Sequence, residues 1–237
     1  MPVNRVPLVL LPGMNCTPRL WSSVLPALTA RGAIREEDVV HGDLAGDDLT
    51  QCVQRLLSTL PPRFALAGLS LGGIVAMALT RTAPERIERL CLLDTNARAP
   101  GPEQRAAFDR QLGRLADGLS AREVQEELID VLLPPRHRAR LREDVLRMGE
   151  ETGERALAQQ YAIQRTRRDE RAHLGRIAVP VAVIAGVEDA LCPPQRHEEI
   201  AGLIPGAELT LIPGTGHLSP LESPREVSDA MAAWLRS

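Results

Sequence analysis

The clearest structural signal in this chain is the stretch GLSLGG at residues 68–73. It directly follows the apolar run Phe64–Ala67 and opens the segment Leu71–Ala83, whose apolar residues have helical spacing. Small residues two positions on either side of a serine let a sharp strand-to-helix turn close without side-chain clashes, and such a turn pushes the hydroxyl outward. The stretch therefore predicts that Ser70 is an exposed nucleophile. The alternative is a tight turn whose glycines only allow close helix packing.

Short apolar runs bounded by turn residues recur along the chain between longer amphipathic segments. The runs predict strands at Val6–Leu11, Val39–His41, Phe64–Ala67, Leu90–Leu93, Val181–Ala185 and Glu208–Ile212. The amphipathic segments predict helices at Leu20–Ala30, Leu49–Leu60, Leu71–Ala83, Gln195–Leu203 and Pro224–Leu235. This alternation predicts an α/β fold with a doubly wound, mostly parallel sheet of about six strands, in which ligands bind at the carboxyl ends of the strands.

The alternation of strands and helices breaks between Leu93 and Val181. From about residue 100 to residue 176 the apolar spacing is helical and no convincing strand is found. Clusters of glycine and proline mark the junctions at 99–102 and 179–180. The sequence therefore predicts a core made of residues 1–99 and 177–237, with a helical insertion at 100–176 after the fourth strand.

Composition excludes several classes of protein. All 28 basic residues are arginine, which rules out Schiff-base enzymes, pyridoxal phosphate enzymes and P-loop proteins, because each of these needs a lysine. A net charge of −3 gives no basic field for phosphates, and an aromatic content of 2% leaves few side chains on which bases could stack. We therefore expect a small-molecule partner and no nucleic acid.

The cysteines and the first apolar run bear on cofactors and location. Cys16, Cys52, Cys91 and Cys192 are isolated, without the paired spacing of a zinc site, so we expect no metal and no cofactor. A reduced, cytoplasmic setting fits this usage. The run Val6–Leu11 is too short for a signal peptide or a membrane span, so no membrane partner is expected.

A serine hydroxyl is a poor nucleophile unless a base takes its proton. His217 lies in the loop GTGHLSPLE, residues 214–222, between the last predicted strand and the final helix. A glycine-flanked loop at the carboxyl edge can carry the imidazole over Ser70, so His217 is the candidate general base, with an exposed loop histidine as the alternative. His41 is expected at the rim of the sheet. The other histidines lie among charges and are expected at the surface: His137, His173 and His197.

The imidazole of a catalytic histidine needs a carboxylate to fix its tautomer. Asp189 follows the strand Val181–Ala185 at a glycine turn, which gives the order Ser, Asp, His along the chain. Asp94 is the alternative acid because it ends the strand Leu90–Leu93 at the same edge, although it can also cap the turn into the insertion. We expect Asp189 to be the partner of His217.

Acyl transfer also needs donors for the oxyanion, and backbone N–H groups on fixed turns supply them. One donor is expected at Leu71, the residue after the nucleophile. The other is expected at Met14, because Gly13 permits a turn after the first strand. An ordinary strand-ending turn is the alternative for this second position.

Taken together, these motifs resemble the α/β-hydrolase fold family over nearly the whole chain. Ser70 on its turn matches the family's nucleophile elbow. Residues 9–21 resemble its oxyanion strand, although Pro12-Gly13 stands where the family usually has His-Gly. Residues 186–193 and 216–224 are similar to its acid loop and its histidine loop. The resemblance also implies that the insertion at 100–176 is a helical cap over the active site.

The resemblance implies a serine enzyme, because the family's haloalkane dehalogenases and epoxide hydrolases carry aspartate where this chain has Ser70. The serine branch includes carboxylesterases, enol-lactonases, thioesterase-like enzymes and carbon–carbon bond hydrolases, which share one triad. We expect a hydrolase of a small carboxylic ester or lactone that forms an acyl-enzyme. With few aromatic residues in the chain, we expect leucine, methionine, valine and isoleucine to line its acyl pocket.

Two alternatives to ester hydrolysis remain open. The same residues can cleave a carbon–carbon bond of a keto-acid, as a hydrolase or a lyase, if a cation in the cap holds the substrate carboxylate. The arginines at positions 165, 167, 168 and 171 cluster where the cap returns to the core, and Arg165 and Arg168 are the candidate contacts. The alternative for this cluster is a charged helix face exposed to solvent. The second alternative is a ligand-binding protein without catalysis on the same fold.

Overall fold

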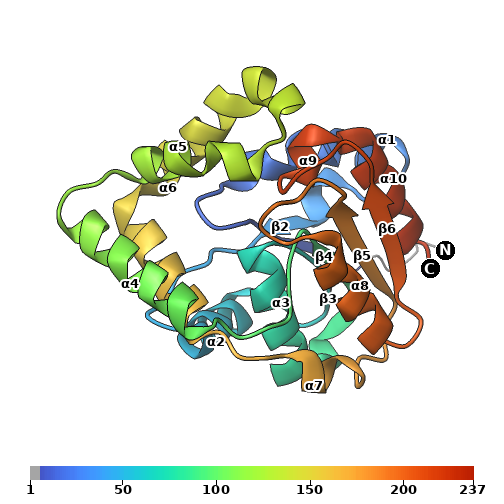
Figure 1. Ribbon diagram of the computed structural model, residues 1–237. Coiled ribbons are helices and arrows are strands. Elements are labelled where there is room, and N and C mark those ends of the chain that lie inside the picture. The colour runs from blue at the N-terminus through green and yellow to red at the C-terminus, as the bar shows by residue number, and fades with distance from the viewer. Residues whose placement is uncertain (1–5) are drawn as a thin grey trace.

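Residues 6–237, which the computed structural model describes, contain a sheet of six parallel strands in the order β2-β1-β3-β4-β5-β6 (Figure 1). The strands are β1 (Leu8–Leu11), β2 (Val39–His41), β3 (Phe64–Leu69), β4 (Ile87–Leu93), β5 (Val181–Gly186) and β6 (Glu208–Ile212). Each expected strand is present, with small differences at its ends. The predicted α/β fold with a doubly wound parallel sheet is confirmed.

Helices cover both faces of the sheet, as Figure 1 shows. One face carries α1 (Leu25–Ala30) and α10 (Pro224–Trp234), and the other carries α2 (Leu49–Thr59), α3 (Leu71–Thr82) and α8 (Pro194–Leu203). The short helix α9 (Ser219–Glu222) precedes α10, and single 3-10 turns occupy Pro18–Trp21, Glu36–Asp38 and Pro84–Arg86. Because both faces are covered, the central strands read as nearly continuous apolar runs.

The first predicted helix differs from the structure. Instead of one helix over Leu20–Ala30, the chain forms the 3-10 turn Pro18–Trp21 and then α1. Pro26 lies in the first turn of α1. Proline lacks an N–H and clashes with the preceding helical turn, so it is accepted at a helix start but not in the middle of a longer helix.

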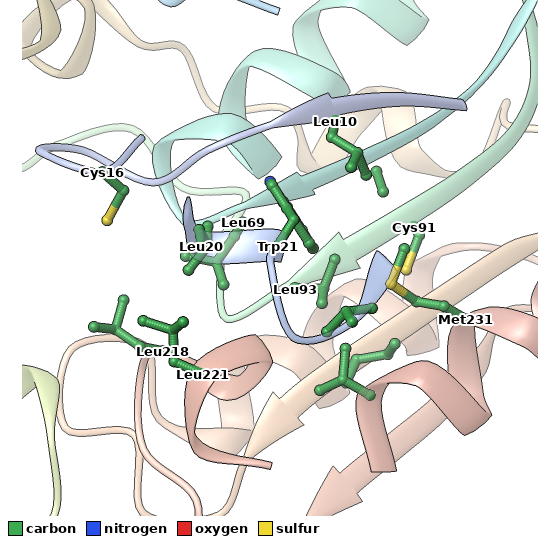
Figure 2. Close-up of a cluster of buried hydrophobic side chains, with 14 of the residues drawn as sticks. Leu10, Cys16, Leu20, Trp21, Leu69, Cys91, Leu93, Leu218, Leu221 and Met231 are labelled. Carbon is green, nitrogen blue, oxygen red and sulfur yellow. The ribbon is translucent and has the colours of Figure 1, made fainter. Parts of the chain in front are cut away.

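The core consists of one apolar cluster on each face of the sheet. Along β1, Leu8 and Leu10 belong to one cluster, whereas Val9 and Leu11 belong to the other, because successive side chains of a strand point to opposite faces. Figure 2 shows part of the first cluster, where Trp21 lies among leucines from the strands and from the histidine loop. Each fully buried leucine stabilises the fold by about 1.5–3 kcal/mol.

Between β4 and β5 the chain forms α4 (Pro102–Ala116), α5 (Ala121–Leu132), α6 (Pro135–Thr166) and α7 (Arg171–Leu174). The helix α6 is kinked at Gly153, whose φ of 73° is not helical. Helices α4, α5 and α6 pack around a third apolar cluster and lie together at one end of the sheet (Figure 1). The division into a core and a cap at residues 100–176 stays a prediction, and residues 1–5 of that core lie outside the described residues.

No helix within residues 6–237 combines the length and the apolar character needed to cross a membrane.

Two glycines allow α3 to pack directly against the sheet. A Cβ atom at Gly72 would overlap the carbonyl oxygens of Leu11 and Pro12, and a Cβ at Gly68 would overlap the Gly72 carbonyl. Both obstacles are backbone atoms, which cannot move aside as a flexible side chain can. The start of α3 is therefore fixed against the end of β1 by backbone contact.

This contact predicts opposite outcomes for two glycine substitutions. Gly72→Ala is expected to lower the free energy of unfolding by at least about 3 kcal/mol, because the added methyl group meets backbone. Gly113→Ala is the matched control: its site on α4 is exposed and open, so alanine is expected to raise that free energy by about 1 kcal/mol. Denaturant unfolding of both variants checks this. A Gly72→Ala protein as stable as the wild type contradicts the prediction.

Candidate active site

The chemically reactive side chains lie in loops at the carboxyl edge of the sheet. Ser70 follows β3, Asp94 follows β4, Asp189 lies in the loop after β5, and His217 lies in the loop after β6. The turn that contains Met14 follows β1 at the same edge. In a parallel sheet all carboxyl ends face one way, so five loops converge on one region.

Ser70 occupies a strained backbone conformation between β3 and α3, with φ 54° and ψ −113°. A non-glycine residue in this region costs about 1–3 kcal/mol and persists only where its surroundings enforce it. Here the Ser70 N–H donates to the Leu93 carbonyl at 2.9 Å, and the Ser70 carbonyl accepts from the Thr95 hydroxyl at 2.7 Å. The backbone of Ser70 is thus tied to the end of the neighbouring strand.

A chain of hydrogen bonds joins Ser70, His217 and Asp189. His217 Nε2 lies 2.8 Å from Ser70 Oγ, and His217 Nδ1 lies 2.7 Å from Asp189 Oδ2. With Nδ1–H donating to the carboxylate, Nε2 is left to accept the serine proton. Asp189 and His217 are each only 3% exposed, so water does not compete for these bonds. The structure therefore brings together the three residues that the sequence predicted as nucleophile, base and acid.

The surroundings of His217 favour its charged form. Burial disfavours the imidazolium, but the charge and hydrogen bond of Asp189, together with the charges of Asp94 and Glu222, more than offset burial and raise the pKa of His217. The other carboxylate oxygen, Asp189 Oδ1, accepts the N–H groups of Leu191 at 2.8 Å and Cys192 at 2.9 Å. These bonds hold Asp189 in position, so it can stabilise positive charge on the ring.

A buried glutamate shapes the histidine loop. The Glu222 carboxylate accepts the Gly216 N–H at 2.7 Å and the Leu218 N–H at 2.8 Å, on either side of His217. Burial raises the pKa of Glu222, against the effect of these two bonds. The His217 N–H itself donates to the Leu132 carbonyl at the end of α5, at 3.1 Å. The loop is thereby fixed both internally and to the insertion.

Asp94, the alternative acid, forms no hydrogen bond with His217 among the described residues. It accepts the Gly186 N–H at 3.0 Å, and it accepts both the N–H and the hydroxyl of Ser219. Asp94 has a φ of 44° and is fully buried. Burial, followed by repulsion from Asp189, raises the pKa of Asp94 well above its usual range. Asp94 connects the end of β5 to the histidine loop, whereas the expectation of a cap on the turn into the insertion is not met.

The two expected oxyanion donors lie beside Ser70. Leu71 is the first residue of α3, where helix N–H groups have no partner within the helix. Within residues 6–237, neither the Leu71 N–H nor the Met14 N–H donates to a protein acceptor. Gly13 packs close to the nucleophile, since a Cβ there would lie 3.7 Å from the Ser70 Cβ. Both N–H groups are free to bind an oxyanion.

Asn15 fixes the turn that carries Met14, a role that no sequence pattern indicated. Its φ is 56°, its N–H donates to Gln160 Oε1 at 2.7 Å, and its side-chain amide donates to the Ala121 carbonyl at 2.8 Å and to Gln125 Oε1 at 2.9 Å. These acceptors belong to α5 and α6. The turn is therefore held in place by the insertion.

Ser70 and His217 open into a cavity of about 250 Å³ between the sheet edge and the insertion. Its apolar lining includes Met14 and Leu128, as expected, but also the aromatic rings of Phe108 and Tyr161. The lining thus includes aromatic side chains besides the expected aliphatic ones, and the two rings pack together on α4 and α6 with centroids 6.0 Å apart.

Arg165 and Arg168, the expected anion contacts, are not placed at the cavity. Neither residue is among the described residues that line the cavity, and both are exposed. Arg165 Nε pairs instead with Asp109 Oδ1 at 2.7 Å. Arg167, at the end of α6, is the arginine of this cluster that lines the cavity. Arg167 directly follows the last residue of α6 and has an extended backbone, so its placement depends on how the helix ends.

His197 is not at the surface as expected but fully buried. Its Nε2 accepts the Thr95 N–H at 2.7 Å, and burial lowers the pKa of His197 to about 4, so the ring is neutral. Thr95 in turn holds the carbonyl of Ser70. The signal that could have revealed this is helical spacing, because His197 lies three residues before Ile200 on the inward face of α8.

One group of side chains has the proximity of a metal site. Asp189, Cys192 and His217 each place a ligand atom within 4.8 Å of the others. A thiol binds metal as thiolate, and burial raises the pKa of Cys192 to about 12. Asp189 and His217 already share a hydrogen bond. The chemistry of this group suits the hydrogen-bonded chain described above better than metal coordination.

Comparison with known proteins places these features in a family. The family model described as "Alpha/beta hydrolase family" matches residues 8–230. A pimeloyl-[acyl-carrier protein] methyl ester esterase from Nitrosomonas europaea is 31% identical, over 94% of this chain and 93% of that protein.

Solved structures give the same result. A hydrolase from Pseudomonas aeruginosa superimposes with a TM-score of 0.83 at 29% identity, over 99% of this chain and 92% of that one. A thermophilic esterase from Thermogutta terrifontis superimposes with a TM-score of 0.82 at 27% identity, over 98% and 89% of the two chains. Since the family model spans most of its length, this chain belongs to the α/β-hydrolase family.

Proposed function

We propose that this α/β hydrolase cleaves a small carboxylic ester or lactone through an acyl-enzyme intermediate. The observation that carries the proposal is the hydrogen-bonded chain from Ser70 Oγ through His217 to Asp189, with distances of 2.8 and 2.7 Å. The name of the Nitrosomonas europaea relative, a methyl ester esterase, supports ester bonds as the target. The cavity beside Ser70 limits the substrate to a small molecule or the end of a longer one.

In the first half of the proposed reaction, Ser70 Oγ attacks the carbonyl carbon while His217 Nε2 takes the hydroxyl proton. The carbonyl oxygen becomes an oxyanion, and the N–H groups of Met14 and Leu71 stabilise it. Asp189 stabilises the imidazolium. The tetrahedral intermediate then collapses: the bond to the alcohol oxygen breaks, and His217 returns the proton to that oxygen.

In the second half, water replaces the alcohol. His217 Nε2 takes a proton from the water as its oxygen attacks the acyl carbon of the Ser70 ester. The second tetrahedral intermediate collapses to the carboxylic acid, and the proton returns to Ser70 Oγ. For a lactone, the alcohol and the acid remain parts of one product.

Carbon–carbon bond hydrolysis of a keto-acid is a second candidate. The specific observation in its favour is Arg167, because this alternative requires a cation that holds the substrate carboxylate, and Arg167 lines the cavity with Ser70. Turnover of an anionic diketone, together with poor turnover of simple esters, would favour this reaction.

Substitution of the nucleophile gives the direct test. Ser70→Ala is expected to lower kcat for a short p-nitrophenyl ester by about 10⁴-fold or more, because the variant lacks the hydroxyl on which the acyl-enzyme forms. A fluorophosphonate probe should label the folded wild type but not the variant. If Ser70→Ala hydrolyses the ester with the kcat of the wild type, the mechanism is contradicted. A folded wild type that stays unlabelled supports a ligand-binding role instead.

The two carboxylates provide a matched pair. Asp189→Asn is expected to lower kcat by about 10³–10⁴-fold, because the amide no longer fixes the productive tautomer of His217. Asp94→Asn is expected to reduce stability more than kcat, because Asp94 accepts the Gly186 N–H and the Ser219 hydroxyl and, among the described residues, forms no hydrogen bond with His217. Steady-state kinetics and thermal unfolding of both variants show which carboxylate acts as the acid. A larger loss of kcat in Asp94→Asn would assign the acid role to Asp94.

The pH dependence follows from the raised pKa of His217. The base is active only when neutral, so kcat/KM should fall as pH decreases through that pKa, at a pH above the usual histidine value of about 6.5. In Asp189→Asn the raising charge is lost and burial remains, so the ring should titrate at lower pH than in the wild type. NMR titration of His217 in both proteins measures this. An unchanged or higher pKa in the variant disagrees with the proposed electrostatics.

A further inference from the structure

Arg167 is a buried cation in the cavity that contains Ser70 and His217. It lies at the carboxyl end of α6 and is only 5% exposed. Burying a charge is costly unless it is paired, and buried arginines usually face a carboxylate. The half-buried Arg81 shows this pattern: its Nε lies 2.9 Å from the buried Glu170 carboxylate.

The groups that hold Arg167 are all neutral. Its Nε–H donates to the Arg98 carbonyl at 3.0 Å, and its two terminal nitrogens donate to Gln164 Oε1 and, at 2.9 Å, to Gln104 Oε1. Within residues 6–237, no carboxylate lies within 4.0 Å of this guanidinium. A guanidinium has five N–H donors, and these bonds use three of them. Two N–H groups are left for a further acceptor.

The charge of Arg167 is not neutralised by the cavity. No aspartate or glutamate is among the described residues that line it, and its other polar lining consists mainly of amides: Asn96, Gln104, Gln111, Gln125 and Gln164. Burial lowers the pKa of Arg167 to about 10, which leaves the guanidinium charged at neutral pH. The cavity is therefore electropositive at Arg167.

The arrangement of Arg167 is rigid as well as electropositive. Its three acceptors come from three segments: the loop after β4, α4 and the last turn of α6. The planar guanidinium is thus fixed in orientation before any ligand binds, which reduces the entropic cost of binding a carboxylate.

We propose that Arg167 binds an ionised carboxylate carried by the substrate, so that this enzyme prefers anionic esters to neutral ones of the same shape. This inference rests on the proposed ester hydrolysis, and it names the substrate class: an ester or lactone with a free carboxylate in the acyl part or in the alcohol part. The carboxylate would accept the two unused N–H groups of Arg167 and supply the missing counter-charge.

Matched pairs of esters test the preference. In monomethyl adipate a carboxylate stands in place of the terminal methyl group of the acyl chain of methyl hexanoate. In hexanoyloxyacetate a carboxylate stands in place of the terminal methyl group of the alcohol part of ethyl hexanoate. In the wild type, kcat/KM for the anionic member of at least one pair should exceed that for the neutral member by about 10-fold or more. Ratios near one for both pairs overturn the inference.

Substitution of Arg167 locates the effect. Arg167→Gln should lower the anionic-to-neutral ratio by about 10- to 100-fold, and Arg167→Lys should lower it less, because lysine keeps the charge but loses the planar fork. Arg165→Gln is the control on the exposed side of α6 and should leave the ratio unchanged. If Arg167→Gln does not fold, the anionic-to-neutral ratio of Arg167→Lys tests the inference. A ratio that stays at the wild-type value in either folded Arg167 variant overturns the inference.

Binding of a product separates this inference from the proposed reaction. Adipate should raise the Tm of the wild type and of Arg165→Gln, but not that of an Arg167 variant. If the protein hydrolyses no ester yet binds adipate through Arg167, the proposed function fails and the anion site stands. If Ser70-dependent hydrolysis occurs but the preference for anionic esters does not depend on Arg167, the proposed function stands and the anion site fails.

Discussion

The backbone contact between α3 and β1 at Gly72 is the constraint on which the site depends. It brings the first turn of α3 against the end of β1, so the chain must reverse direction within the single residue Ser70. The positive φ of Ser70 follows from this reversal, and so does the outward position of its hydroxyl. The same contact brings together the two segments that carry the expected oxyanion donors. The proposed nucleophile and the expected oxyanion donors are thus positioned by the same main-chain packing.

The remaining loops are positioned mainly by buried carboxylates. Asp94 joins the end of β5 to the histidine loop, Glu222 braces that loop from within, and Asp189 is itself held by two backbone N–H groups. Apolar packing alone fixes a loop less well, because it has little directionality, whereas each of these bonds has a required geometry. Their cost is visible in the raised pKa values of Asp94 and Glu222. The loops of the site are thus held in fixed positions by carboxylates that are costly to bury.

The sequence was sufficient for those features that depend on local pattern. The strands were predictable because they are buried on both faces, and Ser70, Asp189 and His217 because each follows a strand at the carboxyl edge. The insertion was less predictable. The arginine that lines the cavity could not be identified among positions 165, 167 and 168. Its identity depends on the kink of α6 at Gly153 and on the path of the chain where α6 ends and returns to the core. The burial of His197 likewise depends on tertiary packing, which a charge-rich local sequence conceals.

The hydrogen bonds of Asn15 bear on how this enzyme can be re-engineered. Asn15 donates to the Ala121 carbonyl and to the side chains of Gln125 and Gln160, so the turn expected to bind the oxyanion is completed by acceptors from the insertion. A chimera that exchanges residues 100–176 with those of a relative that has other residues at positions 125 and 160 would remove these two side-chain acceptors. The insertion is therefore not an independent module, and residue 15 has to be exchanged together with it.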